Sequence, residues 1–144
     1  MNKDNLKKII LYLIKVLRDS VEGKKKLMKL MFLVEHYDLK EKKLNRNGLF
    51  GLDYRIYYYG VFSQQVSDVI SDLIKENEIE DGFPLKLKRD VVIDGPIKEK
   101  IDSVVEIFGK KGGYLLEVDT LKMLGYDPSE KDKIFGKEVK ELIK

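Results

Sequence analysis

The residues of this sequence that could perform chemistry are few, and they do not form a catalytic pattern. His36 is the only histidine, so a zinc site built on several histidines is excluded. Ser63 has no histidine at a spacing that would activate its hydroxyl, and helix capping is a sufficient explanation for it. The absence of cysteine excludes disulfides, thiol nucleophiles and thiolate metal ligands. We therefore expect a protein that is not an enzyme and has no catalytic residues.

One pair of carboxylates deserves a separate test as a metal site. Asp68 and Asp72 are one helical turn apart and could share a divalent cation. Isolated pairs of this kind are common on exposed helix faces, so we predict no metal ligands here. The segment from Gly48 to Gly51 lacks the strand and helix that flank a phosphate-binding loop. Neither a metal nor a cofactor is expected.

Composition favours a single globular domain. The chain has 144 residues, of which 43% are hydrophobic and 37% are charged. Its net charge of +3 is too small to imply nucleic-acid binding by itself. No apolar run is long enough to span a membrane, and the first eight residues lack a signal-peptide pattern, so we expect a cytoplasmic protein without a membrane partner. Abundant Lys and Glu, little Gln and no Cys fit a heat-adapted source, although an AT-rich genome would give much of the same bias.

The elements are organised around residues 54–74. Tyr54, Ile56 and Tyr58 alternate with Arg55, Tyr57 and Tyr59, which predicts a strand with one packed face and one outward face. Gly60 is expected to form the turn that ends this strand, because glycine adopts positive φ without a steric penalty. A helix is predicted to begin at the cap residue Ser63, with Val66, Val69, Ile70, Leu73 and Ile74 on its apolar face.

Two helices are predicted before this strand, over residues 3–18 and 24–37. The second is apolar nearly all round, which is typical of a central buried helix, so Leu30 and Met31 should be almost fully buried. Its amino end carries a basic cluster: Lys24, Lys25, Lys26 and Lys29. A solvated face is the simpler explanation of this cluster, and contact with an acidic partner is the alternative. Residues 39–52 are expected to be a polar connector.

A small hairpin is predicted directly after the Ser63 helix. The alternation of apolar residues favours strands over 85–88 and 91–94 with a turn at Arg89-Asp90; the alternative is a first strand over 78–80 with a turn at Asp81-Gly82. Further helices are expected from Pro96 to Phe108 and over 114–124. A capping-box pattern follows over residues 127–130, and a short final helix carries Val139.

This order of elements predicts an α+β, mostly helical fold. Helix, helix, strand, helix and hairpin is the order of a winged-helix-like module. We expect one domain over residues 1–144, with a winged-helix-like core over 1–95 and a helical extension over 96–144.

A winged-helix module raises the question of DNA binding, which would place the Ser63 helix in the major groove. The exposed face of that helix carries Asp68, Asp72 and Glu76, which phosphates would repel. Other side chains permit an interaction. The candidate nucleic-acid-binding residues are Gln64, Gln65 and Ser67 on the helix and Lys86, Lys88 and Arg89 on the hairpin. DNA binding by a transcriptional regulator is therefore the alternative function.

Two short blocks are similar to a known family. The block Lys26-Leu27-Met28-Lys29-Leu30-Met31-Phe32-Leu33 resembles the K-L-x-K-L-[LM]-[YF]-L helix of the Panacea (SocA-like antitoxin) domain and of related YwgA-like small proteins. The block Tyr57-Tyr58-Tyr59-Gly60-Val61-Phe62-Ser63 resembles their Y-G-P-[YF]-S turn, with Val61 where the family usually has proline. The resemblance covers about residues 5–95, and the remaining chain matches nothing in it.

The resemblance implies a non-catalytic module that binds another protein, as an antitoxin or as an adaptor for a protease. If the module binds protein, exposed aromatic residues beside Gly60 are the best anchors, because aromatic side chains contribute strongly at interfaces. The candidate partner-binding residues are Tyr57, Tyr59, Phe62, Lys24, Lys25, Lys26 and Lys29. The competing interpretation is that the carboxy-terminal helices cover these aromatic residues. A homodimer is compatible with the sequence, which does not identify the partner.

Overall fold

The computed structural model describes all residues, 1–144, and has the α+β class predicted from the sequence. It contains seven helices and three small antiparallel sheets. The helices are α1 (Lys3–Val16), α2 (Gly23–His36), α3 (Gln64–Lys75), α4 (Gly95–Phe108), α5 (Gly113–Met123), the 3-10 helix η1 (Pro128–Ile134) and α6 (Val139–Leu142). The strands are β1 (Ser20–Val21), β2 (Tyr37–Asp38), β3 (Lys43–Leu44), β4 (Arg55–Tyr57), β5 (Gly60–Phe62), β6 (Ile79–Glu80) and β7 (Leu85–Leu87). No helix is both long and apolar enough to cross a lipid bilayer.

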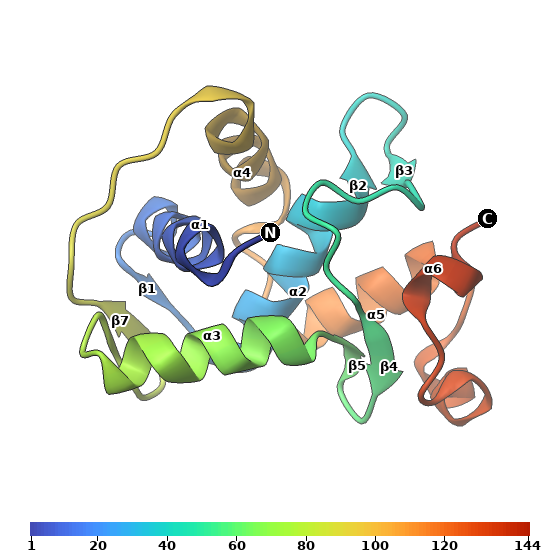
Figure 1. Cartoon of the computed structure of the whole chain (residues 1–144). Helices are drawn as coiled ribbons and strands as arrows, with labels where there is room; N and C mark the ends of the chain where they lie inside the picture. The colour runs from blue at the N-terminus through green and yellow to red at the C-terminus, as the bar shows by residue number, and fades with distance from the viewer.

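Helix α2 is the centre of the molecule, as its apolar sequence predicted. Its residues from Lys26 to His36 are all buried, and Leu30 and Met31 have no exposed surface. Helices α3, α4 and α5 pack against α2, and α1 packs against α3 and α4 (Figure 1). Because α5 and α4 both contact α2, the carboxy-terminal half of the chain shares one hydrophobic core with the amino-terminal half.

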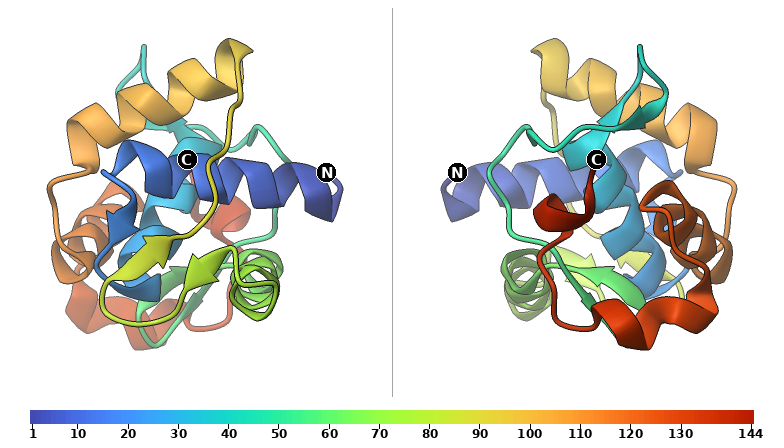
Figure 2. Two further views of the ribbon diagram at one scale, coloured as in Figure 1. Left: turned by 90° about the vertical axis from the view of Figure 1, so that its left-hand side faces the viewer. Right: turned by 90° about the vertical axis from the view of Figure 1, so that its right-hand side faces the viewer.

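The first sheet joins β1 to the hairpin β6–β7, in the order β1-β7-β6 (Figure 2). The hairpin loop between Glu80 and Leu85 contains Asp81-Gly82, so the alternative prediction was right. The predicted strand over 85–88 is present as β7, whereas the strand over 91–94 and the turn at Arg89-Asp90 were wrong. Strand β7 pairs with β6 through Leu87 and Ile79 and with β1 through Leu85 and Val21, so neither of its edges is free. Residues 88–94 therefore form no strand and lead to α4.

The segment at Gly60 is a hairpin rather than a single strand. Strand β4 ends at Tyr57, Tyr58 and Tyr59 form the turn, and Gly60 begins β5 with φ +87°. The prediction that the strand continues to Tyr59 was therefore wrong, and so was the placement of Tyr58 on the packed face, because a residue in the turn does not continue the alternation. Tyr54 and Ile56 are buried as predicted, whereas Tyr58 is 76% exposed.

The outer edge of β4 is covered by the end of the chain. Gly136 N donates to Ile56 O at 2.7 Å, and Val139 N donates to Tyr54 O at 2.9 Å. The carboxy-terminal segment thus holds the hairpin from one side, and α2 and α5 hold β5 from the other. Neither edge of this two-stranded sheet is open to a further strand.

The helix caps confirm several local predictions. The Ser63 hydroxyl accepts from Val66 N at the start of α3, and Val66, Val69, Ile70 and Leu73 are buried. Asp127 forms the predicted capping box, although the helix that follows is a 3-10 helix. Residues 39–52 are less polar than expected. They contain β3, and Phe50 and Leu52 are buried.

Candidate protein-binding surface

Five aromatic side chains gather where the β4–β5 hairpin meets the carboxy-terminal segment, and we call them the aromatic surface. They are Tyr57, Tyr58, Tyr59, Phe62 and Phe135. The Tyr57 ring lies 5.5 Å from the Phe62 ring and 5.6 Å from the Phe135 ring, both edge-on. The exposed fractions are 36% for Tyr57, 67% for Tyr59 and 42% for Phe135. The carboxy-terminal chain thus contributes a ring to this surface without covering it.

A pocket of about 360 Å³ opens among these rings. Its lining residues are Lys29, Tyr57, Tyr58, Tyr59, Gly60, Phe62 and Gln64. Four of them were predicted partner-binding residues, and the structure brings them together from α2 and from the hairpin. Concave sites with apolar walls and a few polar groups are the usual form of a binding site in proteins.

Lys29 is the charged residue of this pocket, and it is 2% exposed. Its Nζ donates to Val61 O at 2.8 Å. Burial lowers the pKa of Lys29 from its ordinary value to about 7, although nearby Glu117 opposes this change. Lys29 is therefore close to half-protonated at neutral pH, which is unusual for a lysine.

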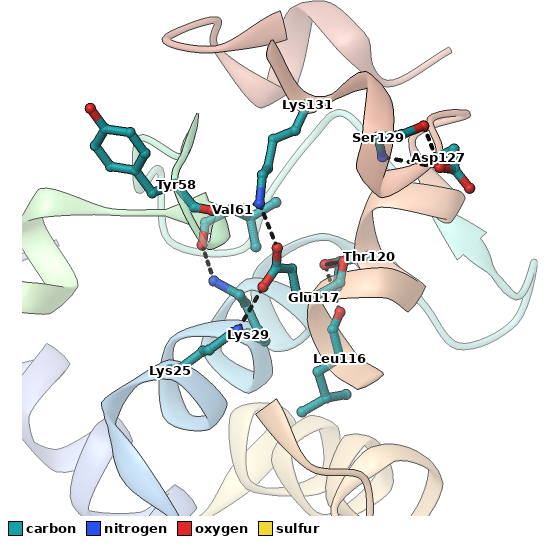
Figure 3. Close-up of polar contacts among 10 residues, drawn as sticks. All are labelled: Lys25, Lys29, Tyr58, Val61, Leu116, Glu117, Thr120, Asp127, Ser129 and Lys131. Atoms are coloured by element: carbon teal, nitrogen blue, oxygen red, sulfur yellow. Dashed lines mark hydrogen bonds and ion pairs between the residues drawn. The ribbon is translucent and has the colours of Figure 1, made fainter. Parts of the chain in front are cut away.

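A buried carboxylate, that of Glu117 on α5, lies between lysines of two other segments, α2 and η1 (Figure 3). Its Oε1 is 2.6 Å from Lys25 Nζ, and its Oε2 is 2.8 Å from Lys131 Nζ. Lys131 also donates to the main-chain oxygen of Tyr58, in the hairpin turn. Burial tends to raise the pKa of Glu117, but hydrogen bonds from the two lysines outweigh burial and hold this pKa below its usual value. The cluster links α2, α5, η1 and the turn that carries the tyrosines.

The basic cluster at the start of α2 is divided by the fold. Lys24 is exposed, with Nζ 3.8 Å from Asp81, and Lys25 places Nζ 4.9 Å from the centroid of the Tyr59 ring. Lys26 is buried and pairs with Glu22 at 2.9 Å. A solvated face therefore explains only Lys24. Lys26 and Lys29 are buried and do not belong to an exposed basic surface, although Lys29 lines the aromatic pocket.

The predicted nucleic-acid-binding residues are separated into two groups with acidic or polar neighbours. On α3, Gln64 donates to Asp68 at 2.9 Å, whereas Gln65 accepts from Asp53 N and Ser67 is half-buried. On and after the β6–β7 hairpin, Lys88 donates to Asn77 at 2.9 Å and Arg89 pairs with Glu78. Of the three residues in this second group, only Lys86 has no side-chain partner.

The acidic face of α3 is also tied to the rest of the molecule. Asp72 is 3.4 Å from Lys3, and Glu76 is 2.7 Å from Lys7, so two of its three carboxylates are paired with α1. The structure contains no group of three or more His, Cys, Asp or Glu side chains that could hold a metal ion.

The polar residues beside the aromatic core have structural partners. Glu35 accepts hydrogen bonds from Phe50 N and Leu52 N, and these bonds hold the connector against α2. The His36 Nδ1 is 2.9 Å from Asn45 O, and burial lowers the pKa of this histidine. Both side chains are about 1% exposed and do not reach the pocket.

Sequence reasoning missed Glu117, Lys131 and Phe135 as parts of this site. Their positions in α5, at η1 and after it have no spacing pattern in common with the hairpin. Comparisons with models of protein families, with curated proteins and with solved structures found no match for this chain.

Proposed function

We propose that this protein is a non-catalytic module that binds another protein through the aromatic surface. The observation that carries the proposal is the exposure of Tyr57, Tyr58 and Tyr59 on one short hairpin, beside Phe135. Exposed apolar patches of this kind mark interaction sites, and tyrosine is enriched at the energetic centre of interfaces. The similarity to Panacea-type antitoxin and adaptor domains supports the same class of function.

The anchoring of the hairpin fits this role. Lys131 bonds to the turn at Tyr58, while Lys29 bonds to β5 at Val61. A surface whose backbone is already fixed loses less conformational entropy when a partner binds. The exposed rings therefore present a preorganised surface rather than a loop that must be ordered on binding.

We further propose a winged-helix-like arrangement for the first part of the chain. Helix α1, strand β1, helix α2, helix α3 and the hairpin β6–β7 follow the order of that module, and the sheet order β1-β7-β6 is compatible with it. In this interpretation residues 37–63, including the aromatic hairpin, are an insertion between α2 and α3. The insertion is the part that would distinguish this chain from a module that only binds DNA.

DNA binding remains the second candidate because of that arrangement. Carboxylates argue against DNA binding. On the helix that would enter the groove, Asp68, Asp72 and Glu76 face outward or toward α1. After the hairpin, Glu78 neutralises the charge of Arg89. Duplex affinity should therefore be weak at physiological salt. Fluorescence anisotropy with random-sequence and genomic duplexes, at several salt concentrations, measures this affinity. Strong sequence-selective binding that is lost when Lys86, Lys88 and Arg89 are neutralised would favour the regulator.

The direct test of the proposed function is photocrosslinking from the surface itself. The protein carries p-benzoylphenylalanine in place of Tyr59 and is expressed in the cells from which the gene comes. Control protein carries the same group in place of Val92, which is 81% exposed and precedes α4. We expect a discrete adduct with one other protein from position 59 and none from position 92.

The adduct is identified by mass spectrometry, and its formation is repeated with Tyr57→Ala in the same chain. Loss of the adduct in this variant supports binding through the aromatic surface. Absence of any specific adduct from position 59, or the same adducts from both positions, would contradict the proposed function.

A further inference from the structure

The buried ammonium group of Lys29 has no carboxylate of this protein as a partner. The two oxygens of Glu117 are already taken, Oε1 by Lys25 at 2.6 Å and Oε2 by Lys131 at 2.8 Å. Lys29 is left with one hydrogen bond, to the uncharged Val61 O. A protonated lysine has three donors, and burying its charge without an anion is unfavourable.

The charged side chains around the pocket also have an excess of positive charge. Three lysines, Lys25, Lys29 and Lys131, face a single carboxylate, Glu117 (Figure 3). The side chains of Lys25 and Lys131 are 31% and 23% exposed, so both also reach solvent beside the aromatic surface. The hairpin contributes only tyrosine and phenylalanine side chains to the pocket, and α3 contributes the uncharged Gln64.

We propose that the pocket takes an acidic segment of the protein partner, with a Glu or Asp carboxylate bound by Lys29 and an adjacent apolar side chain packed among Tyr57, Tyr59 and Phe62. This inference rests on the proposed function and specifies the chemistry of the partner. The carboxylate of the partner would pair with the Lys29 ammonium, which has no carboxylate partner within this protein. The rings supply apolar walls, and an interaction of opposite charges in such surroundings is stronger than in water.

Binding should then depend on the protonation of Lys29. The charged form binds the carboxylate, and the pKa of this lysine in the free protein is about 7. Below pH 7 the affinity should be constant, and above it the affinity should fall by up to about tenfold per pH unit, since one proton is taken up on binding. Lys25, Lys131 and Glu117 also face this group, and both lysines are paired with Glu117, at 2.6 Å and 2.8 Å.

The test uses defined peptides and NMR rather than an unidentified partner. The probe is acetyl-Glu-Leu-Glu-Phe-Glu-amide, and the control is acetyl-Gln-Leu-Gln-Phe-Gln-amide, each titrated to millimolar concentration. The amide signals of Gly60, Val61 and Phe62 report occupancy of the pocket. We expect the acidic peptide to shift these signals with at least about tenfold higher affinity than the control, and to weaken above pH 7.

Two lysine variants make the test specific. Lys29→Met should abolish both the preference for the acidic peptide and its pH dependence. Lys40→Met removes the same charge from an exposed side chain outside the pocket and should leave both nearly unchanged. If Lys29→Met does not fold, the pH dependence of the wild-type protein still decides the matter.

Equal affinity for the two peptides, or an affinity independent of pH between 6 and 9, would overturn this inference. Binding only of a peptide with a free terminal carboxylate, acetyl-Leu-Phe, would also overturn it, because the source of the carboxylate would then be a chain end. The crosslinking experiment tests the proposed function independently of these peptides. A specific adduct from position 59 together with no response to the acidic peptide leaves the protein-binding surface in place and removes only the acidic segment.

Discussion

Lys29 Nζ donates to Val61 O at 2.8 Å, so a side chain from the most buried helix holds β5, the second strand of the hairpin that carries the tyrosines of the aromatic surface. This single bond connects the centre of the core to the candidate binding site. The Lys29 side chain is 2% exposed, so the hydrogen bond positions β5 while burial of the protonated amine lowers the stability of the fold.

Lys29→Met should change the pH dependence of stability. A lysine whose pKa is about 7 in the folded protein and about 10.5 when unfolded binds fewer protons in the folded state between these values, so stability rises with pH across this window. The variant lacks this rise. Urea unfolding of both proteins should show the variant gaining most relative to wild type at pH 6–7, with the difference shrinking toward pH 10. A difference that is constant with pH would contradict the burial of a charged lysine.

Glu117→Gln should destabilise the protein by about 1–3 kcal/mol, because Lys25 and Lys131 lose the charge that they share. The turn at Tyr58 should also become more mobile, since Lys131 holds it. Glu106→Gln on α4 is the matched control, because Glu106 is exposed and has no ion pair. Chemical denaturation measures the first effect and amide hydrogen exchange at residues 57–61 the second. Equal losses in the two variants would show that the cluster does not anchor the hairpin.

Tyr54→Phe should leave the protein as stable or raise its stability by about 1 kcal/mol. The Tyr54 hydroxyl is buried without a hydrogen-bond partner, and burial raises the pKa of this group well above its ordinary value. Tyr12→Phe removes the same atom from a hydroxyl that donates to Asp102 at 2.7 Å, so it should lower stability by about 1–3 kcal/mol. Melting temperatures of the two variants should therefore move in opposite directions or only the second should fall. A large loss in Tyr54→Phe would reveal a partner for its hydroxyl.

Leu30→Ala should cost about 2–5 kcal/mol, because Leu30 is fully buried in α2 and its truncation leaves a cavity. Leu49→Ala is the control. That leucine is 53% exposed, and its truncation should cost less than about 0.5 kcal/mol. Urea unfolding gives both values. A loss of under about half a kcal/mol in Leu30→Ala would mean that α2 is not the centre of the core.

Tyr59→Ala should change the melting temperature little, since the ring is 67% exposed and the Lys25 Nζ atom lies 4.9 Å from its centroid. Tyr57→Ala should cost somewhat more, about 1 kcal/mol, because that ring packs edge-on against Phe62 and Phe135. Both should remove binding of the partner identified by crosslinking. Destabilisation by several kcal/mol in Tyr59→Ala would instead assign the tyrosines to packing.

The sequence by itself determined the local elements. Apolar spacing placed α1, α2, α3 and the later helices to within a few residues, and it identified α2 as the buried centre, because a helix without a polar face has no stable position except in the core. The cap at Ser63 and the capping box at Asp127 were also predicted, since both depend on side chains only a few residues apart.

Only the tertiary structure decided which strands pair and which lysines are buried without a carboxylate partner. The turn at Asp81-Gly82 prevailed because β1, far away in the sequence, occupies the second edge of β7. The lysines at the start of α2 have the same side chain, yet Lys24 is solvated, whereas Lys29 is buried and burial lowers its pKa to about 7. This difference arises because the burial of each lysine depends on what packs against its face of the helix. Lys29, Glu117, Lys131 and Phe135 come from three segments, namely α2, α5 and η1 with the residue that follows it, and no pattern in a linear sequence records contacts over such separations.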